Sequence, residues 1–231
     1  MSTDLWTPPV DPLAGAIVRS DYIIYSLQNI QALFNGLVGD ASADVDIKHT
    51  HKSGTLAARP AASTAGRLYY ATDIKVQFLD TGAAWVVVGI FPSAARAYNA
   101  AAEVIGSGGD TTVLFDSERF DNDTIHNTVT NNGRLTCKTA GIYSIFGALA
   151  FASNATGRRH IKIRLNGVTG IAIHEQQASP TFETSLEIAT LYQLAINDYV
   201  ELIAFQDSTV NLSVIFPNFS PEFGMARIGY I

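Results

Sequence analysis

From Asp110 to Ile231 the sequence alternates repeatedly between apolar and polar residues, and this pattern constrains the fold more than any other feature. The alternating runs are separated by turn-forming residues such as Asn131-Asn132-Gly133, Asn166-Gly167 and Asn197-Asp198. About eight to ten short strands at this spacing are typical of an antiparallel sandwich or jelly roll. We therefore predict a mainly β chain whose last domain, residues 110–231, is a jelly-roll sandwich. The predicted strands are Thr112–Phe115, Arg134–Thr136, Gly141–Phe151, His160–Leu165, Ile171–His174, Phe182–Leu191, Tyr199–Phe205, Val210–Ile215 and Gly224–Ile231.

A second β pattern occupies residues 58–91. Alternating runs at Leu68–Ala71 and Val76–Leu79 are followed, after the turn residues Asp80-Thr81-Gly82, by a third run at Trp85–Val88. This order predicts a meander of three short strands. Because about thirty residues bury too little surface to be stable alone, we expect the meander to be trimeric, with identical neighbours around an axis.

The N-terminal part is expected to attach the chain to another protein. Residues 1–40 begin with a proline-rich arm, and apolar residues then recur at helical spacing after Ser20-Asp21. This apolar stripe has no partner of its own size nearby, so it either packs on sister copies or inserts into another protein. We predict residues 1–40 to be an anchor made of an arm and a short helix, a polar connector at 41–57, and a hinge of small residues at 92–109. The predicted anchor contacts are Trp6, Tyr22, Ile23, Leu27 and Ile30.

His49 and His51 lie in the polar connector. Residues two apart on an extended strand face the same side, so the two imidazoles would point together. Three chains around an axis would offer six nitrogens, which suits an octahedral ion such as iron or nickel better than zinc. We predict that His49 and His51 bind an axial transition-metal ion. The alternative is a pair of solvated histidines in a linker.

The segment from Ala58 to Gly89 resembles a sequence that recurs in fibre and minor structural proteins of tailed bacteriophages. The matching residues are ARPA at 58–61, GRLYYATD at 66–73, DTG at 80–82, and Trp85, Val88 and Gly89. The resemblance implies a virion protein that assembles as a homotrimer. It also supports the metal prediction, because similar His-X-His pairs in trimeric phage fibres and spikes bind an axial ion.

The last domain resembles the jelly roll of the complement C1q globular head and tumour necrosis factor. The resemblance lies in residues 132–136, 140–145, 157–167, 194–202 and 223–229. It implies a trimeric jelly roll. The sequence departs from the family at Cys137-Lys138-Thr139, where a proline is common, at Asn197, where glycine is usual, and in having no collagen-like Gly-X-Y stalk. These departures disfavour a complement-like or cytokine-like role.

Composition argues against several classes of function. The net charge is −6, and Lys and Arg form no large cluster, so we expect no nucleic-acid binding. No run approaches the roughly 18 apolar residues that span a membrane, and we expect no signal peptide. The single cysteine, Cys137, cannot form an intrachain disulfide and is expected to be a small buried strand residue.

We expect no enzymatic activity, because the acidic residues and histidines of the last domain are scattered over strands and turns. Glu118, Asp121, Asn122 and Asp123 form an acid-rich turn that could hold calcium, although it lacks the glycine and the final glutamate of a known calcium loop.

The sequence therefore predicts a structural protein on the virion surface of a tailed bacteriophage, assembled in the host cytoplasm. The main hypothesis is a trimeric fibre or spike, anchored by its N-terminus to another virion protein and available to a host-surface glycan or protein through its tip. One alternative is a trimeric capsid or tail decoration protein with no receptor role. A more remote alternative is a soluble lectin or signalling module.

Overall fold

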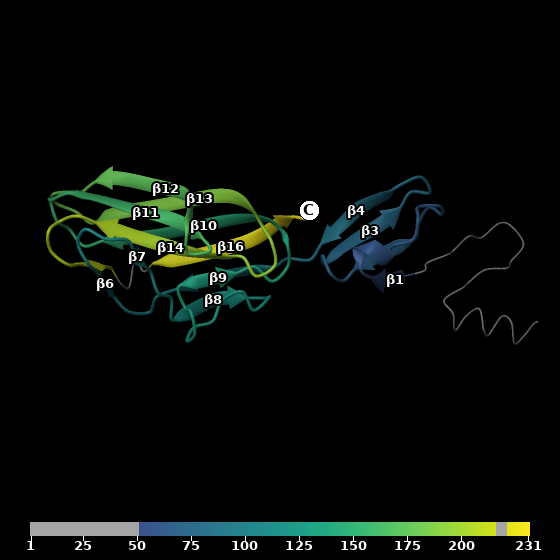
Figure 1. Ribbon diagram of the computed structural model, residues 1–231, viewed down its shortest axis with the longest axis horizontal. Coiled ribbons are helices and arrows are strands. Elements are labelled where there is room, and N and C mark those ends of the chain that lie inside the picture. Colours follow the sequence, from purple (N-terminus) through teal and green to yellow (C-terminus); the bar gives the residue numbers. More distant parts are fainter. Residues whose placement is uncertain (1–50, 216–220) are drawn as a thin grey trace, which may run out of the picture. The chain divides into compact units, whose positions relative to one another are not determined.

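The computed structural model describes residues 51–215 and 221–231, which are almost entirely β (Figure 1). The one helix in these ranges is a single 3-10 turn, η1 (Leu56–Ala58). No described helix is long and apolar enough to cross a membrane. The arm and helix predicted for residues 1–40 lie outside the described ranges.

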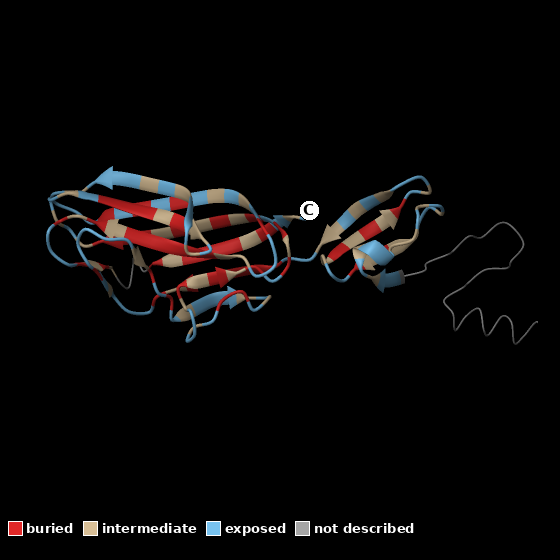
Figure 2. Cartoon of the chain, viewed as in Figure 1, coloured by how far each residue is buried: buried red, intermediate tan, exposed pale blue. Residues whose placement is uncertain are grey.

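A four-stranded sheet contains the predicted meander. Its strands lie in sequence order: β1 (His51–Gly54), β2 (Leu68–Ala71), β3 (Val76–Asp80) and β4 (Trp85–Ile90). The three meander strands match the prediction, whereas β1 comes from the segment expected to be a polar connector. On β2 and β3, side chains alternate between buried and half-buried positions, as expected for strands with one covered face (Figure 2).

The larger of two further sheets has seven strands, with the order β6-β15-β10-β16-β5-β8 and with β13 paired to β10. Its strands are β5 (Ala94–Tyr98), β6 (Glu103–Ile105), β8 (Ser117–Asp121), β10 (Gly141–Phe151), β13 (Thr184–Leu194), β15 (Leu212–Val214) and β16 (Glu222–Gly229). Strand β10 is central, since it pairs over its whole length with β13 and over most of it with β16.

The smaller sheet has five strands, with the order β12-β11-β14-β7 and with β9 also paired to β14. Its strands are β7 (Thr111–Thr112), β9 (Arg134–Thr136), β11 (Arg158–Leu165), β12 (Thr169–Gln177) and β14 (Tyr199–Gln206). All the pairings in both sheets are antiparallel. The two sheets form the predicted jelly-roll sandwich.

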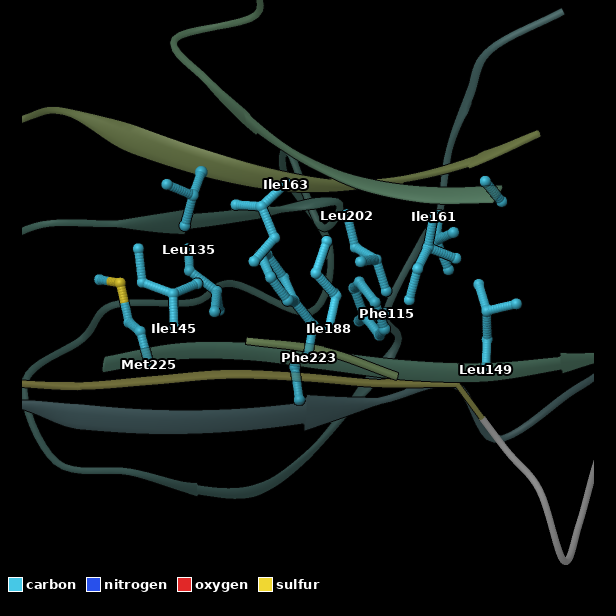
Figure 3. Packing of buried hydrophobic residues seen from close by; sticks show 14 of the residues in the cluster. Phe115, Leu135, Ile145, Leu149, Ile161, Ile163, Ile188, Leu202, Phe223 and Met225 are labelled. Atoms are coloured by element: carbon cyan, nitrogen blue, oxygen red, sulfur yellow. The ribbon is translucent and has the colours of Figure 1, made fainter. Parts of the chain in front are cut away.

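The core lies between these two sheets, where side chains from both layers interdigitate (Figure 3). Ile161, Ile163 and Leu202 come from the smaller sheet, and Ile145 and Phe223 come from the larger one. All five are fully buried. Strand β10 alternates between inward and outward positions along most of its length, which is the pattern that made this strand predictable from the sequence.

The predicted hinge at residues 92–109 is wrong. This segment contains β5, which lies between β16 and β8, and β6, which pairs with β15. The inward side chains of β5 are Ala95 and Ala97, both buried in the core. Alanine therefore serves here as a small core residue of a strand, and the sandwich begins about sixteen residues earlier than predicted.

Candidate interaction surfaces

The predicted anchor residues lie outside the described ranges: Trp6, Tyr22, Ile23, Leu27 and Ile30. His49 also lies outside them, and His51 is the first residue of β1, so the backbone at that position is extended as the metal prediction assumed. Within residues 51–215 and 221–231, no three His, Cys, Asp or Glu side chains are grouped to hold a metal ion. The axial metal site stays a prediction.

The outward face of the larger sheet carries a row of side chains that runs across five strands. Strand pairing places Ala189, Phe146, Gly224, Arg96 and Phe120 next to one another, one from each of β13, β10, β16, β5 and β8. The side chains of a row are neighbours on one face of the sheet. Phe120 is 51% exposed at one end of the row. Beside the row, Ser144 pairs with Leu191, which is 64% exposed.

Phe146 lies flat on this face because its neighbour has no side chain. A Cβ atom on Gly224 would lie 2.2 Å from Cζ of Phe146, so the ring occupies the space above the glycine. On its other side, Gly224 pairs with Arg96, whose guanidinium carbon lies 5.8 Å from the centre of the Phe146 ring. The result is a flat aromatic surface at the middle of the sheet.

Glu222 joins two arginines on the same face. Its carboxylate accepts hydrogen bonds from Arg96 and from Arg119, the latter with an Nη2–Oε1 distance of 3.1 Å. The Arg119 guanidinium in turn lies 3.9 Å from the centre of the Tyr98 ring. Each of these two arginines contacts both a carboxylate and an aromatic ring, and these contacts favour one orientation of its side chain. This surface was not predicted from the sequence, because its members come from strands that are far apart in the chain.

The free edge of β13 is partly covered by side chains of β12. His174 Nδ1 lies 2.6 Å from the carbonyl oxygen of Glu187, and Gln176 Nε2 donates to the carbonyl of Ser185 at 3.0 Å. These contacts occupy two carbonyls that would otherwise be open to a new strand. They also connect the edges of the two sheets.

The outward face of the smaller sheet is electrically balanced. Arg158, His160, Lys162 and Arg164 alternate along β11 and point outward, since Ile161 and Ile163 between them are buried in the core. Carboxylates lie beside all of these basic side chains: Glu175, Asp207, Asp110 and Glu201. Paired charges of this kind leave little net field to attract phosphates.

In the four-stranded sheet, the Asp80 carboxylate organises the turns. It accepts hydrogen bonds from the side chain of Arg67 and from the backbone N–H groups of Ser63, Thr64 and Gly82. Burial opposes ionisation of Asp80, but these hydrogen bonds outweigh it and hold its pKa far below the usual range. Both Asp80 and Arg67 belong to residues 58–91, for which the sequence predicted a meander.

Strand β4 is an edge of that sheet and carries no charged residue. Val86 and Val88 are two positions apart on β4, so they lie on the same face of the strand, and they are 42% and 50% exposed. On β4 and β2, Trp85 and Tyr69 meet edge to face, with ring centres 6.1 Å apart. Among the described strands, none pairs with the outer edge of β4, and an apolar edge strand without charge or proline is a surface on which another chain can pair or pack.

Cys137 and Tyr143 belong to a buried polar cluster at one end of the sandwich. The Tyr143 hydroxyl donates to the carbonyl of Thr139 at 2.6 Å, and the Cys137 thiol donates to the same carbonyl at 3.3 Å. Burial raises the pKa of both groups. A thiol is nucleophilic as the thiolate, so this environment suppresses the reactivity of Cys137 and fits the structural role predicted for it.

The acid-rich turn uses its oxygens for contacts within the chain. Asp121 accepts from the backbone N–H groups of Asp123 and His126, and Asn122 accepts from that of Ala94. Asp123 accepts from the Ser93 hydroxyl at 2.5 Å. These side chains stabilise the turn and the start of β5, so the structure gives no support to the calcium hypothesis in the part of the chain that it describes.

Comparisons with known proteins found partial structural similarity. No protein-family model matches the sequence, and no curated protein matches it. Murine APRIL at pH 8.5 is similar over 60% of this chain and 100% of its own, with 11% identity and a TM-score of 0.47. The globular domain of zebrafish complement 1qA covers 57% of this chain and 94% of its own, with 14% identity and a TM-score of 0.42. The Eiger TNF of S. frugiperda covers 61% of this chain and 94% of its own, with 13% identity and a TM-score of 0.44.

Proposed function

We propose that this chain is a structural protein of a tailed bacteriophage virion, a homotrimeric fibre or spike without enzymatic activity. The N-terminal residues 1–40 attach it to another virion protein, and the jelly roll is the part available to a host-surface glycan or protein. The phage assignment rests on the resemblance of residues 58–89 to phage fibre sequences. The proposal of a trimer rests on a structural observation, which is the flat, partly apolar outward face of the larger sheet.

That face has the composition of a subunit interface. Interfaces between subunits are enriched in aromatic residues and arginine at their centres, and most of their charges are paired. Phe146, Phe120 and Tyr98 supply the aromatic surface, and Arg96 and Arg119 share Glu222. Apolar side chains such as Leu191 extend the same face toward the β13 edge. Identical chains arranged in a closed ring would bury it.

The four-stranded sheet supports the same proposal for a different reason. Its buried apolar side chains are few within the described residues: Tyr69, Ala71, Val76 and Phe78. A sheet this small is marginal alone. The exposed edge strand β4, with Val86 and Val88, is where copies of the sheet would meet around an axis.

Deletion of residues 1–38 tests the attachment. The truncated chain should form soluble trimers, measured by light scattering, that are absent from purified virions. A matched full-length chain with Val129→Ser, a change at an 85% exposed loop position, should be incorporated normally. Incorporation of the truncated chain at the full-length level would contradict the anchor.

Copy number separates the fibre from the decoration protein. Quantitative mass spectrometry of purified particles should give a few trimers per virion for a fibre or spike. Hundreds of copies would instead support a capsid or tail decoration protein. Absence of the chain from purified particles would contradict the virion proposal itself.

A further inference from the structure

Arg227, near the end of strand β16, is a buried arginine whose guanidinium has no partner among the described residues. Only 5% of the residue is exposed. Its Nε, Nη1 and Nη2 atoms are all buried, and none of them donates a hydrogen bond to an atom of the described residues. A guanidinium carries five N–H donors and a permanent positive charge. All of these donors are therefore left over after the chain has folded.

Strand pairing shows that this side chain points into the sandwich. Arg227 on β16 pairs with Tyr143 on β10, and paired residues lie on the same face of a sheet. Tyr143 is completely buried in the core, and so is Met225, the preceding inward residue of β16. The guanidinium therefore lies beside the hydrophobic core and the buried polar cluster of Tyr143 and Cys137, not on the outer surface.

A glycine makes room for the arginine. A Cβ atom on Gly141, the first residue of β10, would lie 2.5 Å from Nε and 3.2 Å from Cδ of Arg227. The backbone N–H of Arg227 also donates to the carbonyl of Ser93 at 2.9 Å. The side chain is thus packed against the backbone of β10, on a strand whose own position is fixed.

The polar groups around Arg227 are already used by one another. The Tyr143 hydroxyl donates to the carbonyl of Thr139 at 2.6 Å. Asp123 acts on Arg227 through its charge. The Oδ2 atom of Asp123, however, accepts from the hydroxyls of Ser93 and Thr139, at 2.5 and 3.1 Å. None of these oxygens accepts a hydrogen bond from the guanidinium.

The guanidinium keeps its charge in this place. Burial lowers the pKa of Arg227, but the pKa of an arginine is so high at the start that the side chain stays protonated. A buried charge without a hydrogen-bonded partner is costly. Water could accept from the N–H groups, but only an anion can also balance the charge.

We propose that Arg227 binds a small monovalent anion, of the size of chloride, inside the sandwich. The ion accepts hydrogen bonds from the free N–H groups of the guanidinium and neutralises it. A small ion fits the site because the side chain is almost entirely covered. The unfolded chain has no such site, so the bound ion stabilises the folded chain.

Urea unfolding of the full-length chain tests the proposal, at one protein concentration and at constant ionic strength. Chloride is exchanged for gluconate, which is too large for a covered site. Between 1 and 300 mM chloride, the folding equilibrium constant per chain should rise at least about tenfold, as expected for one ion with a dissociation constant below about 30 mM. Urea is the denaturant, because guanidinium chloride would itself supply chloride.

Two variants show whether the effect belongs to Arg227. Arg227→Met replaces the guanidinium by an apolar side chain that suits the neighbouring core, and it should abolish the dependence on chloride. Arg158→Met is the matched control, because it removes an arginine whose side chain is 47% exposed and paired with Glu175. This control should keep the wild-type dependence.

Bromide locates the ion in the wild-type chain, so the proposal can be tested even if Arg227→Met does not fold. In crystals of the full-length chain grown in bromide, the anomalous signal should lie within hydrogen-bond distance of the Arg227 guanidinium. A wild-type folding constant that rises less than about tenfold would overturn the proposal, and so would the same rise in Arg227→Met. A bromide map without a signal beside Arg227 would also overturn it, and would mean that water or Asp123 satisfies the guanidinium.

Discussion

The ring of Phe146 lies on the backbone of Gly224, so that a Cβ atom at the glycine would be 2.2 Å from Cζ of the ring. Gly224→Ala must therefore lift the ring off the sheet. If this face joins the subunits, the substitution should weaken the trimer by about 1–3 kcal/mol per subunit, the usual cost of forcing an extra methyl into a packed contact. Concentration-dependent light scattering measures the change.

Gly109→Ala is the matched control for this prediction, because a Cβ atom at Gly109 meets no atom within 4 Å. The control chain should dissociate as the wild type does. Equal dissociation of Gly224→Ala and the control would show that the Phe146 surface lies outside the interface.

A second glycine tests the core of the sandwich. A Cβ atom on Gly147, in β10, would lie 2.7 Å from Cδ1 of Leu202 in the facing sheet. Gly147→Ala should lower the free energy of unfolding by about 1–3 kcal/mol through overpacking. Urea denaturation measures this change, again against Gly109→Ala. An unchanged unfolding midpoint would mean that Leu202 can move away from the added methyl group without loss of stability.

Asp80→Asn should loosen the turns of the four-stranded sheet. The substitution removes the charge that accepts from Arg67 and from three backbone N–H groups. Amide exchange of Ser63, Thr64 and Gly82 at pH 7 should become faster than in the wild type. Exchange in the two sheets of the sandwich should not change, and faster exchange throughout the chain would instead indicate global unfolding.

The lowered pKa of Asp80 also fixes the sign of a pH effect. An ordinary aspartate titrates near pH 4, so the stabilisation is complete above about that pH. It is lost as the pH falls further, toward the lower pKa of the folded state. Wild-type protection at these three amides should therefore decline below about pH 4, whereas the Asp80→Asn variant should show no such decline.

Cys137 should resist alkylation in the folded chain. Its side chain is fully buried and its pKa is raised by burial, so little thiolate reaches the reagent. Iodoacetamide at pH 8 should label it at least about a hundredfold more slowly than in urea, because labelling requires an opening that costs several kcal/mol. Comparable rates in both conditions would contradict the buried position.

Strong alternation made much of the fold predictable. The strand expected at Gly141–Phe151 has those bounds in the structure, and the expected strand at Leu68–Ala71 does too. Strand β5 was missed because its inward residues, Ala95 and Ala97, are small and lie in an alanine-rich stretch, which has the composition expected of a hinge. A strand that lies between two others can need small inward side chains, and the sequence then lacks the alternation of large apolar and polar residues from which strands are predicted.

The candidate surfaces were less predictable, since they depend on strand pairing. Arg96 and Glu222 are 126 residues apart in the sequence, and no local motif connects them. His126 appeared as an isolated histidine, although its Nδ1 lies 2.9 Å from Oε1 of Glu118, only eight residues before it. Their contact requires the loop to turn back over β8. By contrast, the segment around Asp80 was recognisable because its turn residues and its strands are local.

The mass of the full-length chain in solution tests the central proposal most directly. The chain has a mass of 24.8 kDa. Light scattering at micromolar concentration should give three times this value, and the mass should stay constant on dilution over the micromolar range. The complete chain is needed, because a fragment that begins at Asp110 would lack β5 and β6 of the larger sheet. A stable monomer or dimer would contradict the proposed trimer.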